Sequence, residues 1–249
     1  MTEAGAPVLS LVVPAFNEAA RIAGALERIA AYLTSLPYDS ELIVVDDGSD
    51  AAGRKAVEDA LSVLRPGLTR HLLHHEANRG KGAAVRTGCL AARGRYVAFI
   101  DADLATPPEA LGDLIAALEG GADVAVGVRN QADGSDMRNR RGLRRRLVGM
   151  AFAMAVRVLL LPGMRDSQCP LKAFRYEAAQ RLFALQRIDT WSFDAELLYL
   201  ARRLGMQTAQ VPVAWSAVEG SHLRLTRSVG ELVNLLRIRW KHRKVTGNT

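Results

Sequence analysis

Acidic side chains follow three short apolar runs of the sequence, close to the point where each run ends. Glu18 follows the first run, Asp46 and Asp47 the second, and Asp101 and Asp103 a later one. Ligands of an open parallel sheet bind beyond the carboxyl ends of its strands, so these side chains are expected to converge. Converging carboxylates repel one another unless a cation neutralises them, and oxygen ligands suit Mg²⁺ or Mn²⁺. Helix capping or turn formation would explain one cluster alone, but three together favour a divalent metal site.

A basic, glycine-rich turn over residues 78–82 precedes an alanine-rich stretch of helical composition. Free backbone amides at a helix start, with Arg79 and Lys81 beside them, form a natural anion site. An exposed basic turn with no ligand is the alternative interpretation of this segment taken alone. The spacing is not that of the phosphate loop of nucleoside triphosphatases, and no GxGxxG follows the first apolar run, which disfavours a nicotinamide dehydrogenase.

Strands and helices alternate through the first half of the chain. Apolar runs at residues 9–13, 42–45, 96–100 and 124–127 predict buried strands. Apolar residues at helical spacing occur between them, as over residues 22–33. Strand–helix–strand repetition with short connections predicts an α/β fold, in which a mostly parallel sheet carries helices on both faces.

The second half of the chain is less regular. Residues 129–146 are polar and rich in glycine and arginine, which is typical of a loop that orders with its ligand. Residues 147–161 predict an apolar helix, and residues 225–240 an amphipathic helix with several arginines. No internal repeat or low-complexity linker interrupts the sequence, so we expect one continuous domain over residues 1–249.

Composition and charge exclude several classes of protein. With 249 residues, of which 49% are hydrophobic and 24% charged, the chain has the composition of a folded globular protein. Its two cysteines stand alone, so neither a disulfide framework nor a zinc site is expected. Lys and Arg number 33 against 26 Asp and Glu, and the resulting net charge of +7 favours anionic partners. The N-terminal residues lack the pattern of a secretion signal, and the longest apolar run is too short for a bilayer span.

Taken together, the motifs resemble the family 2 inverting glycosyltransferases, which have the GT-A fold, a Rossmann-like sheet flanked by helices. The later motifs resemble the polyprenyl-phosphate branch of that family, above all the dolichyl-phosphate glucosyltransferases and next the mannosyl synthases. The segments that carry the resemblance are residues 12–18, 44–49, 78–82, 101–103, 166–174 and 191–198.

The resemblance implies a nucleotide-sugar site in residues 8–128. Asp46 would hydrogen-bond the uracil or guanine edge. Asp101 and Asp103 would bind Mg²⁺ or Mn²⁺ on the diphosphate, with Lys81 as a catalytic residue that stabilises the leaving group. Displacement would invert the anomeric carbon and give a β-linked product. The residues expected to contact the nucleotide are Pro14, Ala15, Asn17, Glu18, Asp46, Asp47, Gly48, Asp101 and Ala102.

The resemblance also implies an acceptor part in residues 129–249, with the C-terminal helices. Arg129 and Arg145 match arginines that hold the acceptor phosphate, for which a planar guanidinium is well suited. Asp166 matches the residue assigned as catalytic base. A lipid phosphate is already ionised near neutral pH and needs no base. The alternative role for Asp166 is therefore to orient the acceptor phosphate or an arginine.

Two residues depart from the family's pattern. Ala105 stands where the mannosyl synthases often carry glutamine, which favours the glucosyl branch. Pro170 replaces a glycine after Cys169, which removes a backbone N–H close to Asp166.

The sequence therefore predicts a glycosyltransferase that moves a hexose from a UDP-glucose or GDP-mannose type donor to a polyprenyl phosphate. We expect it in the cytoplasm, peripheral at the inner face of the membrane, with residues 147–161 and 225–240 as candidate contacts. Packing of residues 147–161 in the core is an equal alternative. A non-lipid acceptor, a nucleotidyltransferase and a non-catalytic nucleotide- or membrane-binding module are the competing functions. A nucleic-acid partner is not expected, because interleaved aromatic and basic residues are absent.

Overall fold

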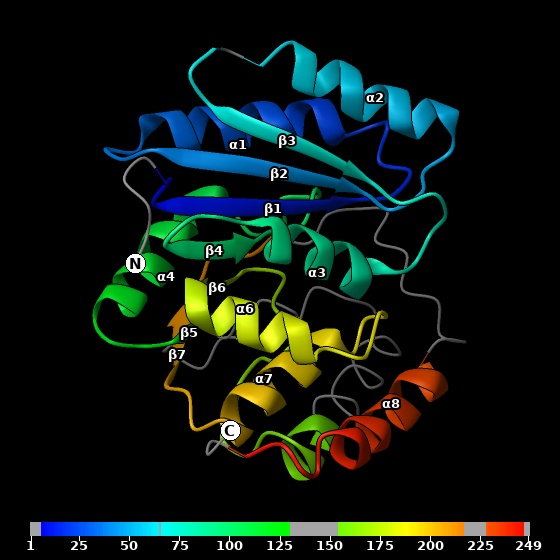
Figure 1. The fold of residues 1–249 in the computed structure, drawn as a ribbon, viewed down its shortest axis with the longest axis vertical. Coiled ribbons are helices and arrows are strands. Elements are labelled where there is room, and N and C mark those ends of the chain that lie inside the picture. The colour runs from blue at the N-terminus through cyan, green and yellow to red at the C-terminus, as the bar shows by residue number, and fades with distance from the viewer. Residues whose placement is uncertain (1–5, 65, 130–153, 217–227, 247–249) are drawn as a thin grey trace.

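The computed structural model of the protein describes residues 6–64, 66–129, 154–216 and 228–246. Within them, seven strands form one sheet in the order β3-β2-β1-β4-β6-β5-β7 (Figure 1). All neighbouring strands are parallel except that β6 runs antiparallel to both β4 and β5. The strands are β1 (Leu9–Ala15), β2 (Ser40–Asp46), β3 (Thr69–His74), β4 (Tyr96–Phe99), β5 (Val124–Val128), β6 (Lys172–Arg175) and β7 (Thr208–Pro212).

The helices lie on both faces of this sheet, as the alternating sequence pattern predicts. A single 3₁₀ turn, η1 (Pro108–Ala110), leads into α4. The helices are α1 (Ile22–Ser35), α2 (Ala51–Ser62), α3 (Lys81–Ala91), α4 (Leu111–Glu119), α6 (Tyr176–Leu185), α7 (Phe193–Arg203) and α8 (Ser228–Lys241). Residues 154–159 are also helical, and the remainder of the helix predicted over 147–161 lies outside the described residues. No helix in the described part of the chain is long and apolar enough to cross a membrane.

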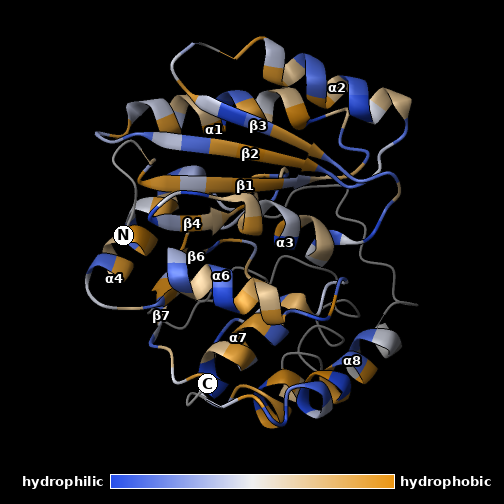
Figure 2. Cartoon of the chain, viewed as in Figure 1, coloured by the Kyte–Doolittle hydropathy of each residue, from blue (hydrophilic) through white to orange (hydrophobic). Residues whose placement is uncertain are grey.

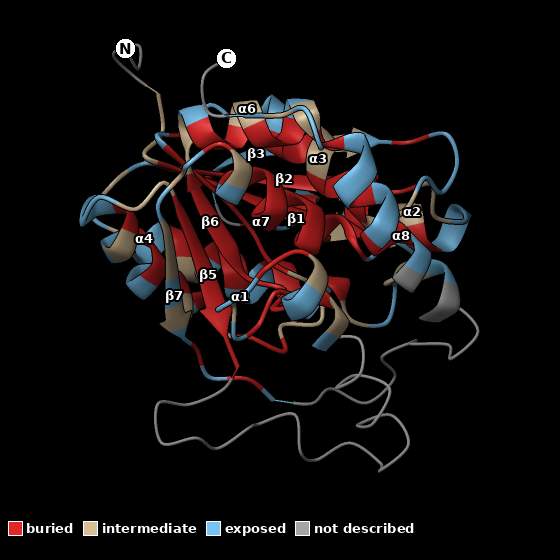
Figure 3. Cartoon of the chain, turned by 90° about the horizontal axis from the view of Figure 1, so that it is seen from below, coloured by how far each residue is buried: buried red, intermediate tan, exposed pale blue. Residues whose placement is uncertain are grey.

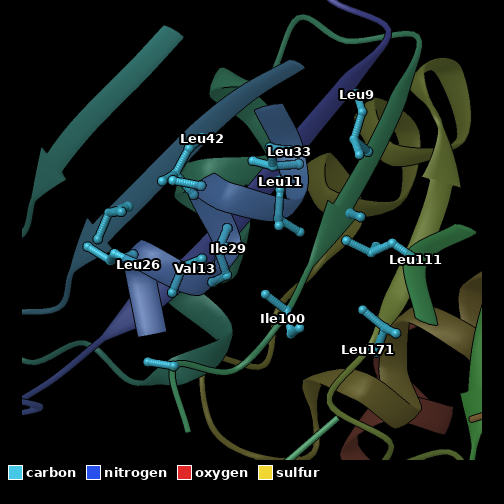
Figure 4. Packing of buried hydrophobic residues seen from close by; sticks show 14 of the residues in the cluster. Leu9, Leu11, Val13, Leu26, Ile29, Leu33, Leu42, Ile100, Leu111 and Leu171 are labelled. Atoms are coloured by element: carbon cyan, nitrogen blue, oxygen red, sulfur yellow. The ribbon is translucent and has the colours of Figure 1, made fainter. Parts of the chain in front are cut away.

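Alternation along the strands divides the apolar residues between the two faces of the sheet. Leu11 and Val13 of β1 point into one core, which α1, α2 and α4 cover (Figure 4). Val12 of the same strand points into the other core, which is covered by α3, α6, α7 and α8. The central strands β1, β2, β4, β6 and β5 are almost entirely buried, whereas the edge strands β3 and β7 and the outward sides of the helices are partly exposed (Figure 3). This arrangement leaves the carboxyl ends of β1, β2 and β4 free to carry a site.

Two strands differ from the pattern that the sequence predicts. β1 continues through Pro14, although the apolar run is expected to end there. Proline has no N–H to donate, but β4 pairs only with residues 9–12 of β1, so no hydrogen bond between these two strands is lost at Pro14. β6 is antiparallel, and it inserts between β4 and β5 although it follows them in the chain. The alternation of strands and helices in the sequence predicts neither this position nor this direction of β6.

Helix α3 packs against β1 at one glycine, and this contact yields a stability test. A Cβ built on Gly88 would lie 2.4 Å from Cγ1 of Val12 and 3.0 Å from Cγ2 of Val45. We expect Gly88→Ala to lower the free energy of unfolding by about 1–3 kcal/mol because the core cannot accept the added methyl group. Gly24→Ala is the matched control, since nothing lies within 4 Å of its Cβ position in α1, and it should leave stability unchanged or raised by about 0.5–1 kcal/mol. Equal effects in denaturant titrations would contradict this packing.

Candidate active site

The acidic turns converge as the sequence predicts. The register of the parallel strands places Ala15 of β1 beside Asp46 of β2, and Val12 beside Phe99 of β4. The segments that follow these strands therefore emerge at the same edge of the sheet. Helix α3 begins at this edge with Lys81, so its first residues face the segment after β4 (Figure 1).

Lys81 and Asp101 form the centre of the site. Lys81 Nζ lies 2.6 Å from Oδ1 and 2.8 Å from Oδ2 of Asp101. Burial opposes the charge of the ammonium, but the carboxylates of Asp101, Asp194 and Asp103 outweigh it and raise the pKa of Lys81 above its ordinary value. The carboxylates around Lys81 therefore favour its charged form. Its Nζ also lies 4.9 Å from the centre of the Trp191 ring, so an aromatic wall limits its movement.

Asp103 is the second carboxylate of the predicted metal pair. Its Oδ1 accepts a hydrogen bond from the amide of Ala105 at 3.0 Å. Burial and then the nearby charge of Asp101 raise the pKa of Asp103 above its ordinary value. The ionised pair is thus short of positive charge, which is what a divalent cation supplies.

A complete metal site is not formed by protein side chains alone. Among the residues that the structure describes, no group of three or more His, Cys, Asp or Glu side chains is placed to hold a metal ion. Two carboxylates at a sheet edge fit a cation that takes its other ligands from substrate phosphates and water, as Mg²⁺ usually does. Asp101 and Asp103 are therefore suited to a metal that arrives with a diphosphate.

Asp47 holds the basic turn before α3 in place. Its Oδ1 accepts from the amide of Arg79 at 3.0 Å and lies 2.6 Å from Nδ1 of His75, while its Oδ2 accepts from the amide of Gly80 at 2.8 Å. Gly80 has φ +104°, and a Cβ there would lie 2.4 Å from the carbonyl oxygen of Asp189. The geometry supports a positioning role for Asp47, since both of its oxygens bind the protein itself.

The turns after β1 and β2 brace each other. The amide of Asn17 donates to Ser49 Oγ at 2.9 Å, and Asn17 Oδ1 accepts from the amide of Asp50 at 3.0 Å. Asn17 adopts φ 54°, a left-handed conformation that asparagine tolerates. A Cβ on Gly48 would lie 2.3 Å from the carbonyl carbon of Ala77, so only glycine fits this approach.

The other residues expected at the nucleotide lie along the same edge. Asp46 is fully buried, and its Oδ2 lies 3.4 Å from Nδ1 of His74 and 3.7 Å from Nε of Arg54. Glu18 pairs with Arg21 at 2.8 Å just before α1. Pro14 and Ala15 form the last residues of β1, and Ala102, which separates Asp101 from Asp103 in the sequence, is buried.

Arg129 and Asp166 form a second, buried ion pair. Asp166 Oδ2 accepts from Arg129 Nε at 2.6 Å and from its backbone amide at 3.2 Å, and Oδ1 accepts from Nη2 at 2.8 Å. Burial opposes the guanidinium charge, but the hydrogen bonds and charge of Asp166 outweigh it and raise the pKa of Arg129. The amide of Gln168 also donates to Asp166 Oδ1, at 3.1 Å. This bidentate contact supports the orienting role for Asp166, and Arg145 lies outside the described residues.

Sequence reasoning assigned no role to a buried pair behind Lys81. Lys172 Nζ lies 2.5 Å from Asp194 Oδ1 and donates to the carbonyl of Cys169 at 2.7 Å. Burial, opposed first by Lys172 and then by Lys81, raises the pKa of Asp194 above its ordinary value. The sequence did offer a signal for this pair. Lys172 lies in the motif over residues 166–174 and Asp194 in the motif over residues 191–198. A lysine in a buried strand usually requires an acidic partner.

Another buried carboxylate, that of Glu196, fixes the loop before α7. Glu196 accepts from the amides of Arg187 and Ile188, with Ile188 at 2.8 Å. Its Oε1 also lies 2.6 Å from Nε2 of His242, after the end of α8. Glu196 therefore joins α7, this loop and α8 at one point.

The fold and the site together define a GT-A glycosyltransferase, and comparison with protein families agrees. Residues 10–183 match the model of "Glycosyl transferase family 2", so the chain belongs to glycosyltransferase family 2. This match confirms the family that the sequence motifs indicate.

Curated relatives and solved structures extend this result. The dolichyl-phosphate beta-glucosyltransferase of Dictyostelium discoideum is 33% identical over 244 residues, which cover 94% of this chain and 74% of the relative. The Homo sapiens enzyme of the same name is 32% identical over 231 residues, covering 86% and 69%. The glucosyl-3-phosphoglycerate synthase of Mycobacterium tuberculosis, solved with Mn²⁺, UDP and glucosyl-3-phosphoglycerate, aligns with a TM-score of 0.67 at 22% identity, covering 94% of this chain and 80% of that one. This structural likeness shows the shared fold.

The repulsion between Asp101 and Asp103 yields a stability prediction, in which removal of one charge stabilises the metal-free protein. Because the folded protein raises the pKa of Asp103, the ionised form at pH 7 opposes folding in the absence of a cation. We therefore expect Asp103→Asn to raise the Tm of the metal-free protein slightly, while asparagine Oδ1 still accepts from Ala105. The same variant should lose the rise in Tm that Mn²⁺ with UDP produces in the wild-type protein.

Asp113→Asn is the control, since Asp113 is an exposed carboxylate in the first turn of α4. It should keep the stabilisation by Mn²⁺ and UDP. If Asp103→Asn keeps it as well, Asp103 is not a metal ligand.

Proposed function

We propose that this chain is an inverting glucosyltransferase that moves glucose from UDP-glucose to a polyprenyl phosphate of the dolichyl phosphate class. The observation that carries the proposal is the group of Lys81, Asp101 and Asp103 at the carboxyl edge of the sheet. Relatives named dolichyl-phosphate beta-glucosyltransferase support the glucose and the lipid phosphate. Structures of the same fold that contain UDP support the nucleotide.

Residues 8–128 hold the donor in this proposal. Asp46 and the turns braced by Asn17 receive the uridine, and Asp47 sets the position of the amides before α3. Asp101 and Asp103 would hold Mg²⁺ or Mn²⁺, which supplies positive charge to the diphosphate. Lys81 adds a fixed charge beside it, because its ammonium stays protonated while the bond to the sugar breaks.

Residues 129–249 hold the acceptor. The guanidinium of Arg129 has the planar donors that recognise phosphate oxygens, and Asp166 fixes its orientation. A lipid phosphate needs placement more than deprotonation, so we assign Asp166 to positioning rather than to proton transfer. Because the acceptor is a membrane lipid, we place the enzyme in the cytoplasm, peripheral at the inner face of the membrane.

The direct test is transfer of label from UDP-[¹⁴C]glucose with Mn²⁺ present. We expect label to enter the organic phase when a polyprenyl phosphate is supplied, and GDP-[¹⁴C]mannose to give far less. The soluble acceptor 3-phosphoglycerate is the second arm, because a neighbour of the same fold is named for that product. Label confined to the aqueous phase would reject the lipid acceptor, and label from neither acceptor would reject the proposed function.

A double-mutant cycle separates the two roles of Asp166. If Asp166 only orients Arg129, Asp166→Asn and Arg129→Lys should each raise KM for the lipid phosphate about tenfold or more. The double variant should then be little worse than either single variant, because both remove one interaction. The pH profile of kcat should keep its acidic limb in Asp166→Asn.

Independent effects that multiply in the double variant, together with loss of that acidic limb, would instead identify Asp166 as the catalytic base. Asp123→Asn is the control for a neutralised carboxylate. Asp123 accepts from the amide of Gln207 beside β7, remote from Arg129 in the fold.

A further inference from the structure

Helix α8 presents a row of apolar side chains to solvent. Val233, Leu236 and Trp240 follow one another at spacings of three and four, so they share one face of the helix. Their exposed fractions are 43%, 58% and 65%. Figure 2 shows this mixture of apolar and polar positions along α8, at the end of the molecule opposite α2. Large exposed apolar side chains in one row are typical of an interaction surface.

The orientation of this row is fixed by the opposite face of α8. Leu235 and Ile238 are fully buried in the core shared with α6 and α7. His242 is buried against Glu196 at 2.6 Å. The helix therefore cannot rotate to hide Leu236 and Trp240 without leaving its core contacts.

A second short helix extends the apolar surface. Met154 and Val158, one turn apart in residues 154–159, have exposed fractions of 59% and 72%. Val156 and Leu160 on the other side of this segment join the same core as α8. Arg239 of α8 donates to the carbonyl of Leu159 at 3.4 Å, which places the two helices side by side. We call Met154, Val158, Val233, Leu236 and Trp240 the apolar face.

Basic residues surround the apolar face at the C-terminal end of α8. Residues 228–246 contain one acidic residue, Glu231, and it receives hydrogen bonds from Thr190 and Ser192. A hollow of about 440 Å³ lies beside Trp240, and its lining combines cationic with apolar side chains. The basic residues of this segment are Arg237, Arg239, Lys241, Arg243 and Lys244, and Arg187 joins three of them in the hollow.

Among the described residues, the partners of these arginines are neutral. Arg237 donates to the side-chain oxygen of Asn234, and the Arg243 guanidinium lies 5.4 Å from the centre of the Trp240 ring. Their charges are therefore available to an external anion. A helix with exposed Leu and Trp on one face and Lys and Arg beside it matches the chemistry of an anionic bilayer surface.

We propose that the apolar face and the basic residues beside it bind an anionic phospholipid bilayer. This inference rests on the proposed function, because it explains how a lipid acceptor reaches the site. The surface is also connected to that site by contacts. Glu231 at the start of α8 accepts from Ser192, and the neighbouring Trp191 lies against Lys81 at 4.9 Å. The bilayer would thus lie next to the aromatic wall of the site.

The test is cosedimentation of the full chain with vesicles that contain neither polyprenyl phosphate nor nucleotide. We expect binding to phosphatidylcholine vesicles that contain phosphatidylglycerol, and much weaker binding to phosphatidylcholine alone. The double variant Leu236→Gln/Trp240→Gln should lower the partition coefficient about tenfold. Lys241→Gln/Lys244→Gln should weaken the preference for phosphatidylglycerol and reduce the salt dependence, while the arginines of this surface remain.

The matched control is Val63→Gln/Leu90→Gln, which changes two exposed apolar residues away from the apolar face. It should bind vesicles as the wild type does. Equal binding by the control and by Leu236→Gln/Trp240→Gln would overturn the proposal, as would a wild-type protein that does not bind. Conversion of a wild-type dimer to a monomer by Leu236→Gln/Trp240→Gln would assign the face to a second copy of the chain and also overturn it.

The outcome is separable from that of the proposed function. Transfer of glucose to a short, water-soluble polyprenyl phosphate does not require a bilayer, so all of these variants should keep it. Vesicle binding without any transfer would reject the proposed function and leave the surface in place. Transfer without vesicle binding would reject only the surface.

Discussion

The ion pair between Lys81 and Asp101 is the contact on which the arrangement of the site depends. It joins the start of α3 to the end of β4, two elements that reach the edge of the sheet from different parts of the chain. Burial alone would lower the pKa of Lys81, and three nearby carboxylates raise it above its ordinary value. A site built this way has a fixed positive charge and an excess of negative charge around it. This excess of negative charge is what a divalent cation would neutralise in the proposed function.

The buried charges at and near the site form ion pairs with one another. Lys172 and Asp194 pair behind Lys81, and Arg129 and Asp166 pair at the end of β5. Removal of one partner from such a buried pair usually costs several kcal/mol, since the other charge is left without compensation. These pairs therefore act as rigid supports. They set where charges lie before any ligand arrives, which is the condition for electrostatic catalysis.

The sequence alone predicts the sheet edge well because strand ends and glycine turns are local features. The α/β fold, the convergence of Asp46, Asp101 and Asn17, and the family all follow from short segments. The antiparallel β6 does not, because its four residues carry no local signal that distinguishes the two directions. Nor do the contacts of Asp47, since a carboxylate that binds a nucleotide and one that binds backbone amides look alike in a sequence. The pairing of Asp166 with Arg129 joins residues 37 positions apart, and only the tertiary structure brings them together.

Glu196 has a consequence that reaches beyond its own hydrogen bonds. Its carboxylate holds both the loop that leads to Trp191 and the residue that follows α8. Together with the contact between Ser192 and Glu231, this side chain therefore fixes the position of α8 relative to the wall beside Lys81. Because the surface that we propose to bind a bilayer lies on this helix, the Glu196 contacts would also help to set the distance between that bilayer and Lys81.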